Sequence, residues 1–183
     1  MERGAMHGFL SEESICAHKD YLKRLSLEYS ILLASEPSLC EKRACEIPRL
    51  RIKRDIRDEA YAKCREIELH ELYFSSFSEE RGRCERLPEG FRSAAELLYE
   101  IYRVASERRE ADFLVVVGDK RRGRVRACRD KDIGPREVAI LALDLCEHAY
   151  FPDYNYDRDR YLKSAIPRLN LSLVSDFVLS VGK

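Results

Sequence analysis

The chain has 183 residues, of which 45% are hydrophobic and 36% are charged, as expected for one globular domain or two small ones. Its 33 basic residues balance its 33 acidic ones, and this zero net charge argues against a general binder of nucleic acids. The sequence contains no apolar run long enough to cross a bilayer and begins without an apolar signal-peptide core, so we expect no membrane partner.

The first half of the chain predicts two amphipathic helices. A hydroxyl followed by two acids at Ser11–Glu13 is a typical helix start. Apolar residues then recur at steps of three and four from Ile15 to Leu32, and again from Ile52 to Phe77. Because two prolines lie between these stripes, we expect an antiparallel helical hairpin that forms an N-terminal domain over residues 1–85.

The second half predicts an α/β domain over residues 86–183, after a loop rich in glycine and proline at 81–90. The expected elements are a helix at 93–108, strands at 113–117, 124–128 and 138–144, and helical structure at 157–181 that Pro167 breaks. The chain is therefore predicted to be an α+β protein: a helical hairpin, then a small three-stranded antiparallel sheet flanked by helices.

Seven cysteines are scattered along the chain, an odd number without a CxxC pair. This pattern argues against a disulfide framework and against a zinc site made of four thiolates. We expect free thiols that behave as small apolar residues in a reducing compartment, which predicts a cytoplasmic protein.

A carboxylate and an imidazole, Asp144 and His148, stand four residues apart after an apolar run. Such a pair suits a borderline or redox-active metal ion, but a buried, hydrogen-bonded Asp/His pair explains this segment equally well. His18 and His70 fall on the two apolar stripes, where a single histidine is usually an ordinary core residue. Together the four offer three neutral nitrogens and one anionic oxygen, which favours a first-row metal with an open coordination position.

Four stretches of the chain resemble the iron/manganese superoxide dismutases, in a divergent form. The stretch Leu143–Tyr150 is similar to that family's Asp-x-Trp-Glu-His-Ala-Tyr signature, here without the tryptophan. The other three are Ser11–His18, Leu69–Phe74 and Tyr154–Leu162. The order of the predicted elements also fits, so the resemblance covers nearly the whole chain.

The resemblance implies that His18, His70, Asp144 and His148 bind one Mn or Fe ion per subunit, with a metal-bound water or hydroxide as the catalytic fifth ligand. The implied enzyme is an oxidoreductase that disproportionates superoxide to oxygen and hydrogen peroxide. Glu147 matches the family residue that orients a ligand histidine of the other subunit, which implies a homodimer.

The resemblance also assigns residues to the funnel through which substrate reaches the metal and to the contact between subunits. Arg158 and Tyr161 are expected to line the funnel or to brace the interface. Leu22 stands where the family has a histidine, and Phe151 stands where it has that histidine's tyrosine partner across the interface. Losing both polar groups together leaves neither one unpaired, so an apolar contact is expected there.

The residues that orient the bound solvent differ most from the family. The sequence contains no glutamine and no tryptophan. Glu66 lies at the glutamine position of iron-type members, and Lys131 lies near that of manganese-type members. Near the metal, Glu66 is expected to favour the oxidised ion because it is anionic; alternatively, it faces solvent or pairs with Lys131. Ser26 occupies the position of the family tyrosine, for which Tyr21 or Tyr29 substitutes only if the helix register differs.

Two other functions are consistent with parts of the sequence. The missing glutamine, tyrosine, histidine and tryptophan favour a divergent metal-binding member with weak or no dismutase activity. The basic run Lys120–Arg126 is a candidate nucleic-acid or anion-binding segment, although a short basic hairpin on a neutral protein is usually a solvated surface. We therefore expect no nucleic-acid partner. The sequence does not discriminate between Mn and Fe.

Overall fold

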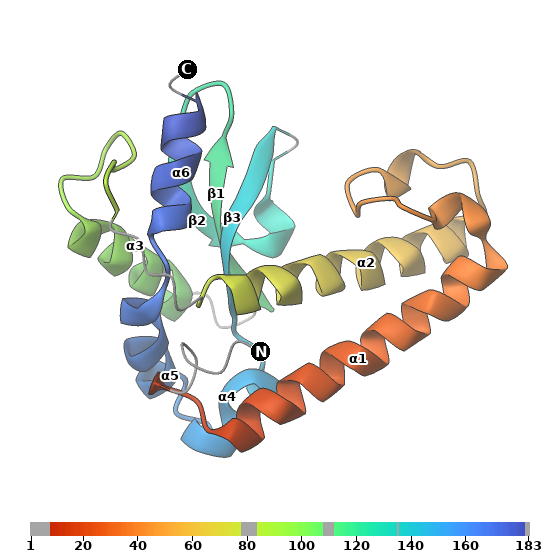
Figure 1. The fold of residues 1–183 in the computed structure, drawn as a ribbon, viewed down its shortest axis with the longest axis horizontal. Coiled ribbons are helices and arrows are strands. Elements are labelled where there is room, and N and C mark those ends of the chain that lie inside the picture. The colour runs from red at the N-terminus through yellow and green to blue at the C-terminus, as the bar shows by residue number, and fades with distance from the viewer. Residues whose placement is uncertain (1–7, 78–83, 108–111, 135, 182–183) are drawn as a thin grey trace. The chain divides into compact units, whose positions relative to one another are not determined.

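The structure, a computed structural model, describes residues 8–77, 84–107, 112–134 and 136–181. In chain order its helices and strands are α1 (Glu12–Ser35), α2 (Arg54–Ser75), α3 (Ala94–Glu107), β1 (Phe113–Asp119), β2 (Val125–Arg129), β3 (Glu137–Asp144), α4 (Glu147–Tyr154), α5 (Arg158–Ala165) and α6 (Ser172–Val181) (Figure 1). This order confirms the predicted α+β class, with a helical N-terminal region followed by an α/β part.

The chain divides into two compact units, one comprising Cys16–Glu71 and the other comprising Met1–Ile15 with Leu72–Lys183. The compact unit of the helical pair thus ends earlier than the predicted hairpin domain. The proposed domain boundary at 85/86 stays a prediction, and residues 81–83 of the predicted loop lie outside the described residues. None of the helices in the described ranges has the length and apolarity that a membrane span needs.

The unit Cys16–Glu71 is built on the pairing of α1 with α2. The Tyr21 hydroxyl donates to Glu66, and Lys63 pairs with Glu28, so contacts later in α1 fall earlier in α2. The helices are therefore antiparallel, as predicted. The connection between them contains the short 3-10 helices η2 (Pro37–Leu39) and η3 (Ile47–Arg49). Its apolar side chains form a core with the first half of α2: Leu39, Ala44, Ile47, Ala60 and Cys64.

The larger unit contains an antiparallel sheet in the order β2-β1-β3. The central strand β1 is buried along almost its whole length, as expected when both faces of a strand are covered. Phe113 pairs with Asp144 at one end of β1, and Gly118 pairs with Val125 and Val138 at the other. The carboxylate of Asp144 is thus fixed at one defined end of the sheet.

Helix α6 packs closely against the end of the sheet that contains Gly118 (Figure 1). A Cβ atom placed on Gly118 would lie 2.3 Å from Cε1 and Cζ of Phe177. A glycine inside a strand often marks such a close approach of another element. Gly118 is therefore required here for packing.

Candidate metal centre

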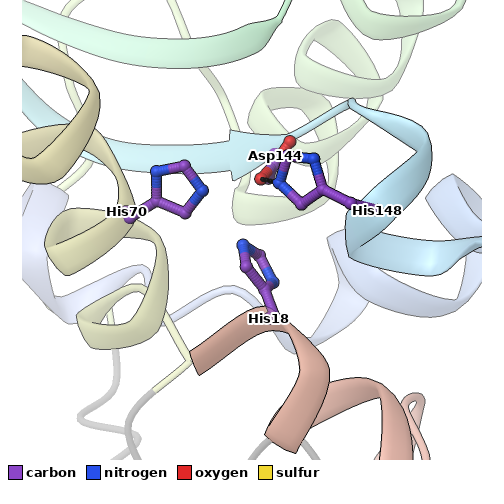
Figure 2. A group of neighbouring side chains, drawn as sticks. All are labelled: His18, His70, Asp144 and His148. Carbon is purple, nitrogen blue, oxygen red and sulfur yellow. Dashed lines mark hydrogen bonds and ion pairs between the residues drawn. The ribbon is translucent and has the colours of Figure 1, made fainter. Parts of the chain in front are cut away.

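Helices α1 and α2 carry two buried histidines, His18 and His70, whose rings lie 5.0 Å apart in an edge-to-face arrangement (Figure 2). Nδ1 of His70 lies 2.8 Å from the backbone oxygen of Glu66. Because a carbonyl oxygen only accepts, Nδ1 donates its hydrogen to it. Nε2 of His70 then carries the lone pair, which is the tautomer that a metal ligand needs.

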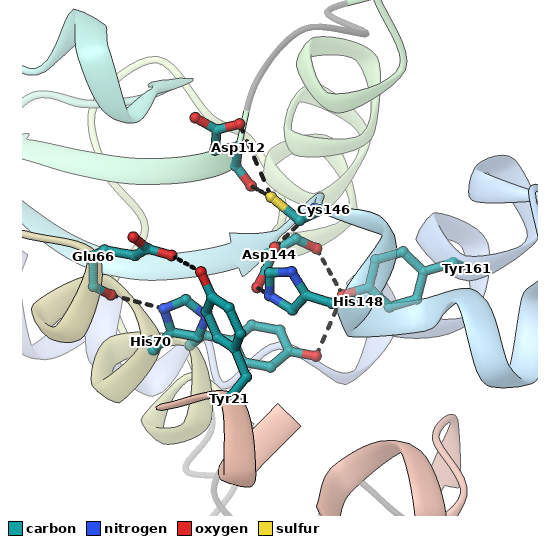
Figure 3. Close-up of polar contacts among 9 residues, drawn as sticks. Tyr21, Glu66, His70, Asp112, Asp144, Cys146, His148 and Tyr161 are labelled. Carbon is teal, nitrogen blue, oxygen red and sulfur yellow. Dashed lines mark hydrogen bonds and ion pairs between the residues drawn. The ribbon is translucent and has the colours of Figure 1, made fainter. Parts of the chain in front are cut away.

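The side chain of Glu66 is held one helical turn before His70 (Figure 3). Its Oε1 accepts a hydrogen bond of 2.5 Å from the Tyr21 hydroxyl, and the Tyr21 ring lies 5.4 Å from the His70 ring. Tyr21 therefore braces both Glu66 and His70. The Glu66 side chain is half-buried and bonded to Tyr21; its expected place near the metal stays a prediction.

The end of β3 and the start of α4 hold the other two candidate ligands, Asp144 and His148 (Figure 2). Asp144 is fully buried, and its Oδ1 accepts from the backbone N–H of Cys146 at 2.8 Å. Its Oδ2 lies 3.0 Å from Nε2 of His148, whose side chain is 32% exposed. The predicted Asp/His pair is therefore formed within the strand end and the first turn of the next helix.

The geometry of this pair fits a metal ion. Two ligand atoms that each lie about 2.1 Å from one ion and about 90° apart are separated by about 3.0 Å. The measured separation of Asp144 Oδ2 and His148 Nε2 has this value. The arrangement is also a good hydrogen bond, so it accommodates a proton or an ion between the same two atoms.

Buried tyrosines support the Asp144 end of the strand, and Figure 3 shows one of them, Tyr161, beside Asp144. The Tyr161 hydroxyl donates to the backbone oxygen of Asp144 at 3.0 Å, and the hydroxyls of Tyr161 and Tyr73 lie 3.4 Å apart. The ring of Tyr150 stacks on Tyr161 at 4.8 Å. Tyr161 has no exposed surface and supports the strand end; its expected place in the funnel or at the subunit contact stays a prediction.

Burial raises the pKa of Tyr73 and of Tyr161 well above the ordinary tyrosine value of 10.0. The folded protein therefore keeps these protons at pH values where the unfolded chain loses them, and stability falls as pH rises above about 10. Between pH 8 and 11 each tyrosine is expected to remove about 1.4 kcal/mol from the free energy of unfolding.

Urea unfolding at pH 8 and pH 11 measures this effect in the wild type and in Tyr73→Phe. Other titrating groups are common to both proteins, so the difference between their losses isolates Tyr73. The variant should lose about 1.4 kcal/mol less than the wild type over this range. Equal losses in the two proteins would contradict the assignment.

Three further predicted residues belong to the larger unit: Lys131, Arg158 and Glu147. Lys131 Nζ pairs with Asp112 Oδ2 at 3.5 Å. Arg158 donates to the backbone oxygen of Ala105 at 3.2 Å, which ties α5 to the last turn of α3. Glu147 is exposed. Their expected roles in solvent orientation, the funnel and the dimer stay predictions.

Two further predicted positions, Leu22 and Phe151, concern the expected subunit contact. Leu22 is half-buried on α1. Phe151 is 38% exposed, and its ring lies 5.1 Å from that of Tyr156, which is 77% exposed. The surface of α4 and the turn after it therefore presents a pair of aromatic side chains.

Comparison with known proteins gives a family match over just more than half of the chain. The sequence model described as "Iron/manganese superoxide dismutases, C-terminal domain" matches residues 82–176. This range contains Asp144 and His148 with the whole sheet. A search of the curated proteins gave no significant match.

Proposed function

Because the chain belongs to the iron/manganese superoxide dismutase family, we propose that it disproportionates superoxide to oxygen and hydrogen peroxide. The proposed cofactor is one Mn or Fe ion per subunit, with His18, His70, Asp144 and His148 as its protein ligands. When bound, such an ion supplies a one-electron couple that oxidises one superoxide and reduces the next.

The observation that carries this proposal is the Asp144–His148 pair, which stands in the family-matched segment at the separation of two ligand atoms on one ion. His18 and His70, each of which offers one ring nitrogen, are proposed as the other two ligands. Three imidazoles and one carboxylate suit Mn and Fe, whereas closed thiolate sites select zinc.

The chain's own residues are proposed to orient the ligands and to set the charge around them. The Glu66 carbonyl fixes the tautomer of His70, and the backbone N–H of Cys146 fixes one oxygen of Asp144. Partners that orient metal ligands in this way typically contribute 10-fold to 100-fold, roughly, to metal affinity or activity. The reaction consumes two protons for each peroxide formed, and Tyr21 and Glu66 are hydrogen-bonded polar groups beside His70.

The proposal includes a homodimer in a reducing, cytoplasmic compartment. Exposed aromatic side chains such as Phe151 and Tyr156 are enriched at protein interfaces. Glu147, exposed and next to His148, is proposed to reach across that interface. All seven cysteines are free thiols, which supports the choice of compartment.

The direct test is to express the protein with Mn or with Fe in the medium, measure bound metal, and follow superoxide decay by stopped-flow absorbance. We expect close to one ion per chain and a decay rate proportional to the metal-loaded protein. A fully loaded protein whose rate does not exceed that of the free metal salt would reject the dismutase.

A metal-loaded protein without superoxide consumption would instead support a metal-binding member of the family with weak or no dismutase activity. The specific observation in its favour is Glu66, a carboxylate bonded to Tyr21 at a position where the family carries a neutral amide. An anionic group beside the ligands opposes reduction of the ion, which is one half of the reaction cycle.

A further inference from the structure

The turn between β1 and β2 carries four exposed cations on a well-ordered backbone. We call Lys120, Arg121, Arg122 and Arg124 the hairpin tip. The backbone oxygen of Asp119 accepts from the N–H groups of Arg122 and Gly123 at 3.2 Å and 2.9 Å. The Asp119 carboxylate accepts from the N–H of Arg121 at 2.8 Å. Gly123 closes the turn at φ 63°, a left-handed conformation that favours glycine.

The hairpin tip is also anchored to the body of its unit. Phe177 of α6 packs on Gly118 at the end of β1, and a Cβ on Gly123 would lie 3.7 Å from Val181. The backbone N–H of Asp119 donates to the oxygen of Arg124 at 2.9 Å. The four side chains are therefore presented from a fixed backbone, which reduces the entropy lost when they bind a ligand.

The cations of the hairpin tip differ from the arginines that follow them in the chain, which are paired with carboxylates. Arg126 pairs with Glu137 at 2.6 Å, and Arg129 pairs with Asp132 at 3.0 Å. Within the described ranges, the four side chains of the hairpin tip form no ion pair with a carboxylate. The neutral charge of the whole chain thus coexists with a local excess of positive charge at this turn.

The proposed dismutase reaction does not explain this charge. In the sheet, Asp144 pairs with Phe113 at the start of β1. The tip follows Gly118, which lies five residues further along that strand. Five residues of a strand span about 17 Å, and the Debye length at physiological salt is about 8 Å. The tip is therefore too far from Asp144 to draw a small anion to it effectively.

We propose that the hairpin tip binds the phosphate backbone of a double-stranded nucleic acid. Guanidinium groups bind phosphate oxygens in a bidentate fashion, and three of the four cations are arginines. A DNA duplex carries one negative charge per about 1.7 Å of its axis, a density of phosphates that several cations on one turn can contact together. The tip has no apolar side chain to insert into a bilayer, which disfavours a membrane surface as its partner.

This inference goes beyond the proposed dismutase activity and is independent of it. The zero net charge argues only against a protein that is basic throughout. With about four phosphate contacts, the binding is expected to be weak and strongly salt-dependent, with a slope of log K against log salt near −3.6.

Fluorescence anisotropy with a labelled 20-base-pair DNA duplex of random sequence tests the proposal at low ionic strength. The test variant replaces Lys120, Arg121, Arg122 and Arg124 with glutamine. The control variant makes the same replacement at four exposed cations elsewhere, Arg49, Arg51, Lys53 and Arg92. Both variants replace one lysine and three arginines, so their net charges are equal.

We expect the wild type and the control variant to bind the duplex with similar affinity and the test variant to bind at least about 10-fold more weakly. A wild type that does not bind the duplex would overturn the proposal, and so would equal losses in the two variants. Binding to vesicles that contain anionic phosphatidylserine, but not to the duplex, would assign the tip to a membrane surface and also overturn it. Circular dichroism checks that all three proteins are folded.

Discussion

Replacing His70 with alanine is expected to abolish metal binding and superoxide consumption together. The substitution removes one of the four proposed ligands and leaves the carbonyl of Glu66 without its imidazole donor. Because removal of partners that only orient ligands already costs about 10-fold to 100-fold, loss of a ligand should reduce metal content and activity by more than about 100-fold. Metal analysis by mass spectrometry and stopped-flow superoxide decay measure the two quantities.

A matched control for this variant is Ser75→Ala, which alters an exposed side chain on the same helix. It should keep both metal and activity. Thermal unfolding of the metal-free proteins separates a ligand role from a folding role, since His70→Ala should fold without metal while failing to bind it. An alanine variant that retains stoichiometric metal and full activity would remove His70 from the proposed centre.

Replacing Glu66 with glutamine is expected to raise the reduction potential of the bound ion. Glu66 lies one helical turn from His70, so the two Cβ atoms are about 5–6 Å apart. An anion at about 8 Å from the metal in a medium of effective dielectric about 20 stabilises the oxidised ion by about 2 kcal/mol. For a one-electron couple this corresponds to about 90 mV, by which the neutral amide should raise the potential.

Redox titration followed by the visible absorption of the ion measures this shift. Glutamine still accepts the hydrogen bond from Tyr21, so the variant changes charge with little change in shape. Glu71→Gln removes the same charge from an exposed position of α2 and should shift the potential much less, because water screens it. An unchanged potential in Glu66→Gln, or an equal shift in both variants, would exclude the proposed role of Glu66.

The fold could be predicted from sequence because its signals are local. The three strands alternate or run apolar between turn residues, and the structure places β1, β2 and β3 within a few residues of the predicted ranges. Pro167 was expected to break the C-terminal helical region, and it lies in the short 3-10 helix η5 (Ile166–Arg168) between α5 and α6. Pro167 thus marked the interruption between two helices correctly, whereas Pro152 lies inside α4 and marks no end.

The inner face of α2 was predicted less well. The predicted apolar stripe from Ile52 to Phe77 continues from His70 to Phe74 at a step of four, but the structure buries Tyr73 completely and Phe74 only in part. Two adjacent aromatic residues both fit a helical stripe. The hydroxyl of Tyr73 finds a partner in Tyr161, 88 positions away, and no local pattern identifies such a pair.

The candidate site shows the same division between local and distant signals. The Asp144–His148 pair was identified from a spacing of four residues, which a strand end and one helical turn bring together. The bond between Tyr21 and Glu66 joins two helices through the register of their packing. That register depends on which side chains fill the connection between the helices, so it requires the folded structure.

The packing of Phe177 on Gly118 constrains how the protein can be altered at its C-terminus. The last helix supplies an aromatic ring that occupies the space a side chain at position 118 would fill. Deleting α6 would therefore uncover the face of the middle strand around its glycine, and an exposed apolar face of this kind promotes aggregation. Affinity tags and fusion partners belong after Val181 with a flexible spacer, and even alanine at position 118 would displace the ring and loosen the end of the chain.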